Sequence, residues 1–140
     1  MSFNEKSLWL LLLALLGGFG WYFARVLPGH GANVTSAQVV LFVVMLGLVG
    51  ISQILGQALL AIAHRRELGQ RTQRDERDGL IALRGSRIGA HVLATGAFAA
   101  LCAALLIPGN FAFTHTLLAF WVLAQAVEYA AQLVLYRRGG

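Results

Sequence analysis

Residues 36–63 read SAQVVLFVVMLGLVGISQILGQALLAIA and contain no Asp, Glu, Lys or Arg. A helix needs about 20 apolar residues to cross the hydrocarbon core of a bilayer, which is roughly 30 Å thick. This stretch meets that requirement, and the basic run His64-Arg65-Arg66 marks its end. It is therefore predicted to be a transmembrane helix.

Similar apolar stretches lie before and after this one, at about residues 7–26, 87–107 and 114–136. Pro28-Gly29 follows the first stretch and Pro108-Gly109 separates the last two, and both residue types end helices. Only 12% of the residues are charged, compared with about 25% in soluble domains. The sequence thus predicts an all-α fold, a single transmembrane domain over residues 1–140. It would form a four-helix bundle with a loop at 64–86.

The basic residues are divided unevenly between the two sides of the predicted membrane. Ten of the eleven Lys and Arg residues fall in the N-terminus, the segment 64–87 and the C-terminus, and Arg25 is the exception. Lys and Arg concentrate in cytoplasmic segments of membrane proteins. Both termini and the loop are therefore predicted to be cytoplasmic. Because topology explains the net charge of +5, no nucleic-acid partner is expected.

The two halves of the chain resemble each other. Leu27-Pro28-Gly29 is similar to Ile107-Pro108-Gly109, and a double arginine follows both the second and the fourth apolar stretch. Two helical hairpins of the same orientation would explain this, and parallel repeats of this kind occur in transporters. Coincidence would explain it equally well, because such residues often end membrane helices.

Small residues allow helices to approach closely in lipid. In the third predicted helix they share one face, made up of Gly89, Gly96, Ala100 and Ala104. This face predicts a close contact within the bundle or with a second copy of the chain. A homodimer is therefore compatible with the sequence.

The fourth predicted helix carries a carboxylate, Glu128, on the same face as two glutamines. A second polar stripe lies on the helix at 36–63. If these two helices pack together, the intramembrane polar cluster would comprise Glu128, Gln125, Gln132, Gln53, Gln57 and His91. An ionisable residue inside the membrane is a candidate functional site, which would suit a proton- or cation-coupled transporter. Alternatively, the cluster holds the bundle together by interhelical hydrogen bonds.

The four histidines raise the question of a haem or a metal ion. His64 and His91 lie near the predicted cytoplasmic ends of their helices and are weak candidates, and His30 and His115 lie near the opposite ends. No CxxCH, HExxH or zinc-type spacing occurs. No cofactor is predicted, and a membrane cytochrome is the least favoured class. Since no nucleophile–base pair or phosphate loop is present, an enzyme is not expected.

The loop contains Asp75-Glu76-Arg77-Asp78, followed by Ile81, Arg84, Arg87 and Gly89. This pattern resembles the loop signature of an uncharacterised family of small four-helix bacterial membrane proteins with a DERD-type cytoplasmic loop. The resemblance implies the same topology over the whole chain and a place in the inner membrane of a bacterium, and it supplies no mechanism. Thr72 and Asp75 are spaced as in a capping box, so a helix beginning near Gln73 could continue into the third predicted helix.

Orientation explains the arginines of the loop but not its acidic residues, because Asp and Glu contribute little to topology. We therefore expect the segment 74–87 to contact a cytoplasmic protein partner or lipid headgroups. The expected contact residues are Asp75, Glu76, Arg77, Asp78, Arg84 and Arg87. The sequence favours a non-enzymatic membrane protein with a regulatory, sensory or scaffold role, and a small transporter is the alternative.

Overall fold

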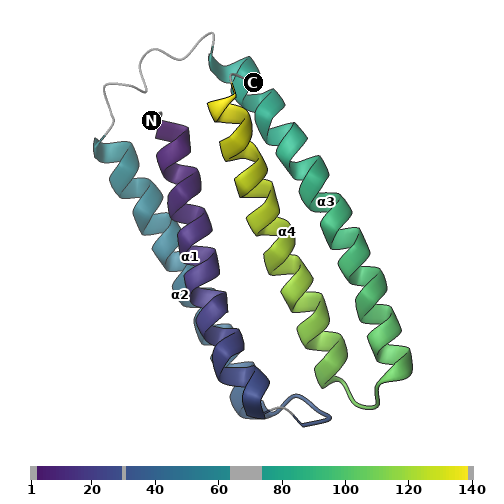
Figure 1. Cartoon of the computed structure of the whole chain (residues 1–140). Coiled ribbons are helices and arrows are strands. Elements are labelled where there is room, and N and C mark those ends of the chain that lie inside the picture. The colour runs from purple at the N-terminus through teal and green to yellow at the C-terminus, as the bar shows by residue number, and fades with distance from the viewer. Residues whose placement is uncertain (1–2, 30, 64–73, 139–140) are drawn as a thin grey trace.

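The computed structural model describes residues 3–29, 31–63 and 74–138. In these residues the chain forms the helices α1 (Phe3–Val26), α2 (Ser36–Ala63), α3 (Arg74–Leu106) and α4 (Phe111–Arg137), with a short 3-10 turn (Leu27–Gly29) after α1. Each α-helix is long and apolar enough to cross a membrane. The predicted all-α, four-helix architecture is therefore confirmed (Figure 1).

Helix α3 begins earlier than the predicted boundary at about residue 87. Residues 74–86, which were assigned to a loop, form its first turns. Asp75 and Glu76 lie in the first turn of this helix, where negative side chains interact favourably with the positive end of the helix dipole. The predicted loop boundary is thus wrong, whereas a helix start near Gln73 agrees with the observed start at Arg74.

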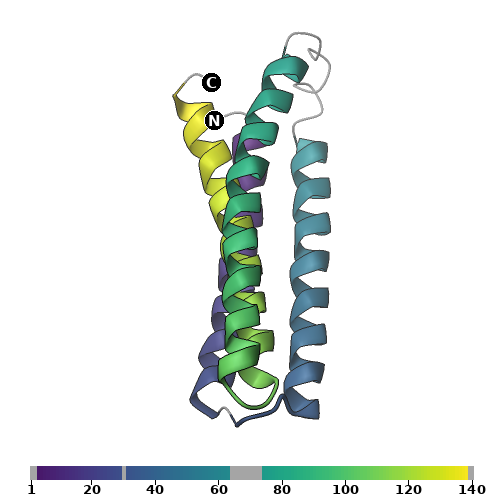
Figure 2. The ribbon, with the colours of Figure 1, turned by 90° about the vertical axis from the view of Figure 1, so that its right-hand side faces the viewer.

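The helices contact one another in the order α2–α1–α4–α3 (Figure 1), and α2 stands to one side of the other three (Figure 2). Helix α1 packs against both α2 and α4, and α4 also packs against α3. Within the described residues, α2 makes no close backbone contact with α3 or α4. Both chain termini and the start of α3 lie at one end, here named the terminal end, and the turns at 27–35 and 107–110 lie at the other, the turn end (Figure 1).

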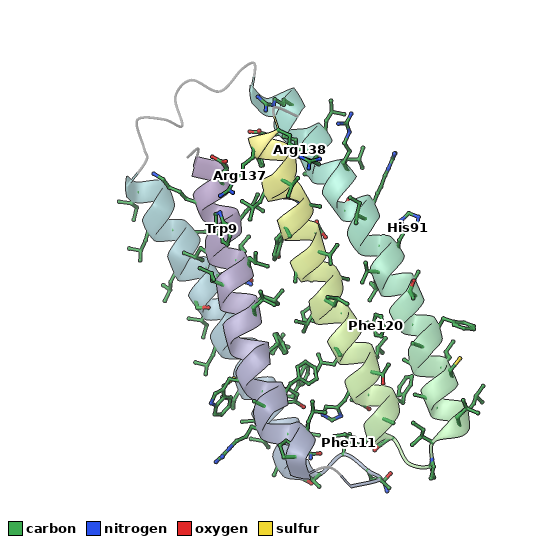
Figure 3. The ribbon with its side chains drawn as sticks, viewed as in Figure 1. Trp9, His91, Phe111, Phe120, Arg137 and Arg138 are labelled. Carbon is green, nitrogen blue, oxygen red and sulfur yellow. The ribbon has the colours of Figure 1, made fainter. Side chains whose placement is uncertain are left out.

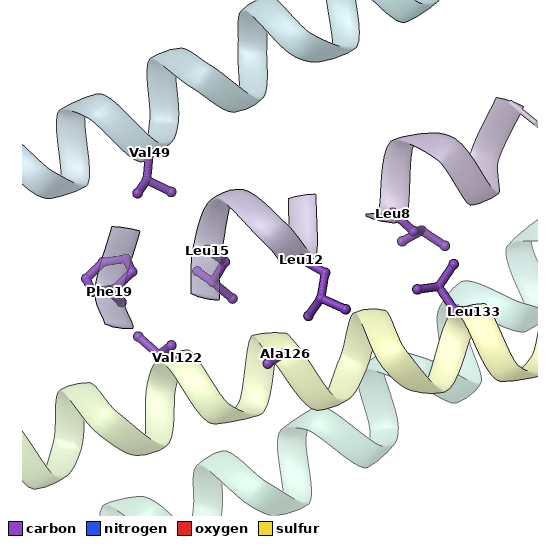
Figure 4. Packing of buried hydrophobic residues seen from close by; sticks show 8 residues of the cluster. All are labelled: Leu8, Leu12, Leu15, Phe19, Val49, Val122, Ala126 and Leu133. Carbon is purple, nitrogen blue, oxygen red and sulfur yellow. The ribbon is translucent and has the colours of Figure 1, made fainter. Parts of the chain in front are cut away.

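Helix α1 is the central packing element. It buries one side chain every three or four residues: Leu8, Leu12, Leu15, Phe19, Tyr22 and Val26. This spacing places the row on one face of the helix. Val122, Ala126 and Leu133 of α4 and Val49 of α2 pack against it (Figure 4). Val49 is the only buried residue among those of α2 whose side chains are described. Most of the other side chains described in α2 are exposed, so much of the surface of this helix is left uncovered by the other three.

The backbones of α3 and α4 approach each other along a row of small residues. The buried members of this row are Gly85, Gly89, Gly96 and Ala100. A Cβ atom on Gly89 would lie 3.0 Å from the carbonyl oxygen of Ala124, and one on Gly96 would overlap the side chain of Phe120. The small-residue face of α3 therefore meets α4, with the exception of Ala104, which is exposed.

At the turn end, the two loops are joined by hydrogen bonds. The backbone N–H of Val34 donates to Oδ1 of Asn110 over 2.7 Å, and the N–H of Phe111 donates to the carbonyl oxygen of Ala32 over 3.1 Å. Gly109 has a φ of +89°, and a side chain there would collide with the carbonyl of Ala32. Glycine at 109 thus permits both the turn and the contact between the loops.

Replacing Gly96 by alanine should destabilise the protein by about 1–3 kcal/mol, the usual cost of overpacking. The added methyl group meets the Cβ of Phe120, which cannot move without moving the α4 backbone. The measurement is the unfolding free energy of the purified protein in mixed micelles.

The matched control is Gly47→Ala in α2, because no heavy atom lies within 4 Å of the added Cβ there. This variant should unfold at the same denaturant concentration as the wild type, or slightly later, since alanine favours helix more than glycine does. Equal stability of the Gly96 and Gly47 variants would contradict the close α3–α4 contact.

Candidate functional site

The terminal end of α3 presents two different faces. Ile81 is 2% exposed, and with Gly85 and Gly89 it lies on the face that packs against α4. The outward face carries the exposed side chains of Arg77, Leu80, Arg84, Arg87 and His91. The helix therefore holds its arginines on the side away from the rest of the bundle.

The predicted contact residues are all helical in the structure. Arg77, Arg84 and Arg87 are exposed, and Asp78 is half-buried. The backbones of Asp75 and Glu76 belong to α3, whereas the positions of their side chains lie outside the described part of the chain. A rigid helix, rather than a loop, thus displays the basic residues of this segment.

Glu128 lies half-buried at the contact between α4 and α3. Its Oε1 atom accepts a hydrogen bond of 3.3 Å from Nε2 of Gln132, one turn further along α4. Its other carboxylate oxygen, Oε2, would be 3.3 Å from a Cβ atom on Gly89. The absence of a side chain at Gly89 therefore makes room for the carboxylate between the two helices.

The remaining members of the predicted polar cluster do not assemble around Glu128. Gln125 and Gln132 share α4 with it, but Gln53 and Gln57 lie on α2, which has no close backbone contact with α4 in the described residues. The reason is the helix order, in which α1 lies between these two helices. The prediction that the two glutamine stripes meet is therefore wrong.

His91 is also absent from this cluster. Its ring points away from α4 (Figure 3), and Nδ1 lies 2.6 Å from the carbonyl oxygen of Arg87 on the same helix. Because a carbonyl oxygen only accepts, Nδ1 is the protonated nitrogen that donates. His91 thus belongs to the outward face of α3 together with Arg84 and Arg87.

A buried polar contact at the turn end was not anticipated from the sequence. His115 is only 4% exposed, and its Nδ1 lies 3.0 Å from the carbonyl oxygen of Phe111. The hydroxyl of Tyr22 lies 3.1 Å from its Nε2. When Nδ1 donates to the carbonyl, Nε2 accepts from the Tyr22 hydroxyl, so neutral His115 is satisfied at both nitrogens. The rings of Tyr22 and Phe111 stack on the imidazole.

The described residues contain no cluster of side chains suited to a metal ion. Within them, no group of three His, Cys, Asp or Glu side chains could hold a metal ion. The weak candidate His64 lies outside the described part of the chain, and His91 stands alone on the outward face of α3.

No family model, no curated protein and no solved structure matches this chain. The resemblance to small membrane proteins with a DERD-type loop therefore stays a prediction.

Replacing Tyr22 by phenylalanine should destabilise the bundle by about 1–3 kcal/mol, because it leaves the buried Nε2 of His115 without a donor. The double variant Tyr22→Phe/His115→Phe removes both partners, so it should lose less than the sum of the single variants. The measurement is a double-mutant cycle on the unfolding free energy. Additive losses would contradict a coupled Tyr22–His115 pair.

Proposed function

We propose that this chain is a non-enzymatic protein of the bacterial inner membrane with a regulatory, sensory or scaffold role. In this proposal the terminal end is cytoplasmic, and α3 carries the surface that contacts a cytoplasmic protein or lipid headgroups. The uneven distribution of Lys and Arg supports this orientation. We define the contact surface as residues 74–87.

One observation carries the proposal. Helix α3 has 33 residues, which corresponds to roughly 50 Å at 1.5 Å per residue, whereas the hydrocarbon core is roughly 30 Å thick. The helix is therefore long enough to extend beyond the membrane at one end, and its exposed arginines lie at that end. A contact made there would be rigidly connected to the transmembrane part of the protein through a continuous helix.

The transporter interpretation has less support. It depended on Glu128 lying among four glutamines from two helices, and Gln53 and Gln57 lie on a helix that makes no close backbone contact with α4 in the described residues. What remains is Glu128 with its neighbour Gln132 at the α3–α4 contact. That arrangement suits a structural hydrogen bond within the bundle better than a path for ions.

Site-specific photo-crosslinking tests the contact surface in living cells. A photoreactive side chain at Leu80, which is exposed at 56%, should give a defined adduct with a protein or a lipid. Its yield should fall at least about fivefold after Arg84→Glu/Arg87→Glu, if each reversed charge costs about 1 kcal/mol. Asp75→Lys/Glu76→Lys should lower the yield of a protein adduct, whereas it should not lower that of an adduct with an anionic lipid, because it adds positive charge.

The matched control position is Leu59 near the terminal end of α2, which is exposed at 67%. A photoreactive side chain there should not give the adduct seen at Leu80. If both positions gave the same adducts, and the charge reversals left the yields unchanged, the contact surface on α3 would be rejected.

A further inference from the structure

We propose that the outward face of α3 binds the headgroup of an anionic phospholipid between Arg84, Arg87 and His91. This inference rests on the proposed function and specifies the ligand of that same contact surface. The ligand class is a lipid with a net negative headgroup, such as phosphatidylglycerol, rather than a free anion or a protein.

The depth of the three residues in the membrane supports this assignment. Leu106, the last residue of α3, lies nineteen positions after Arg87, or roughly 29 Å along the axis. This distance nearly equals the thickness of the hydrocarbon core, so Arg87 lies at the boundary with the headgroups when Leu106 lies at the opposite boundary. Arg84 is then about 5 Å further out and His91 about 6 Å further in.

The outward face of α3 is polar at the terminal end and apolar further along the helix. A phospholipid is likewise polar at its headgroup and apolar along its acyl chains. Arg77, Arg84, His91, Phe98 and Leu105 follow one another at intervals of seven residues. Each interval turns about 20° around the helix, so the five residues form a line that winds slowly, by about 80° in total. The first three are polar, whereas Phe98 and Leu105 are apolar and exposed at 71% and 86%. A headgroup at Arg84, Arg87 and His91 would place its acyl chains along the apolar continuation of this line.

The chemistry of the three side chains favours a phosphate with a net negative charge. Each guanidinium presents a planar pair of N–H donors that matches two phosphate oxygens. Because Nδ1 of His91 donates to the carbonyl of Arg87 over 2.6 Å, Nε2 is the nitrogen that remains for the headgroup. In the neutral ring Nε2 accepts from a headgroup hydroxyl, such as those of phosphatidylglycerol, and in the protonated ring it donates to a phosphate oxygen. The ring points away from α4 (Figure 3), toward the side from which a lipid would approach.

The acidic groups described nearby lie on other faces. Glu128 approaches α3 from α4 at Gly89, and Asp78 is half-buried, whereas Arg84 and Arg87 are exposed. Orientation in the membrane requires positive charge only on the correct side. Orientation does not require the arginines to share an exposed face with a histidine, or to lie above a row of apolar residues. Binding of a phospholipid requires both.

Native mass spectrometry of the full chain in mild detergent tests the proposal. Phosphatidylglycerol and phosphatidylcholine of the same acyl chains are titrated separately. The wild type should bind at least one phosphatidylglycerol more tightly than any phosphatidylcholine. The variant Arg84→Gln/Arg87→Gln should bind it about tenfold to thirtyfold more weakly, the effect of losing two charges near the surface.

Arg138→Gln provides the matched control, because Arg138 is exposed at the same end of the molecule but follows α4. It should weaken phosphatidylglycerol binding by no more than about fivefold, the effect of one charge near the surface, and therefore by less than the loss of both Arg84 and Arg87. The variant Arg84→Lys/Arg87→Lys keeps both charges but loses the planar pairs of donors, so it should bind phosphatidylglycerol more tightly than the glutamine variant and more weakly than the wild type. Because this variant retains the basic character of the helix, it keeps the test decisive even if the glutamine variant does not fold.

Two results would overturn the lipid assignment. One is phosphatidylglycerol binding that is unchanged in the glutamine variant, and the other is equal affinity of the wild type for the two lipids. If a protein adduct at Leu80 persisted together with either result, the ligand would be a protein and the proposed contact surface would stand. If the protein without charge reversals gave no adduct at all at Leu80, the proposed function itself would be rejected.

Discussion

The close approach of the α3 and α4 backbones is the interaction on which the arrangement depends. In lipid, helices gain nothing from hydrophobic burial against each other, so small residues and tight van der Waals contact must hold them together. Glycines at 85, 89 and 96 allow that contact. They also orient α3, because a helix that turns its glycine face toward α4 must turn its arginines outward. The outward basic face at the terminal end is therefore a consequence of packing elsewhere on the same helix.

Periodicity and composition predict much of this fold but not which helices are neighbours. The bounds of α2 agree with the predicted range 36–63, because an uninterrupted apolar stretch with a basic end leaves little choice. The sequence places the start of α3 too late, because a membrane helix was assumed to end where charged residues begin. A helix can also continue through charged residues into the region beyond the lipid. The order α2–α1–α4–α3 was not predictable, because all four helices have apolar residues on every side.

Contacts within one helix of the candidate site were predictable, whereas contacts between helices were not, because the sequence does not reveal which helices are neighbours. The helical face shared by Glu128 and Gln132 follows from their spacing, and a hydrogen bond joins their side chains. Whether Gln53 joins them depends on the neighbours of α2, which one sequence does not reveal. Tyr22 and His115 are separated by 93 residues. Each residue occupies a packing face of its helix, but many other residues do so too. This position alone therefore does not identify Tyr22 and His115 as partners.

The central claim is that α1 separates α2 from α4 in the membrane, and disulfide formation between paired cysteines in membranes tests it most directly. In a Cys102→Ala background, Gly18→Cys/Val49→Cys should form a disulfide rapidly. The Cβ atoms at 18 and 49 would lie 3.9 Å apart, within the usual range of about 3.5–4.5 Å. Gln57→Cys/Glu128→Cys should remain reduced under the same conditions. Equal rates for the two pairs would contradict the helix order and the separation of the predicted polar cluster.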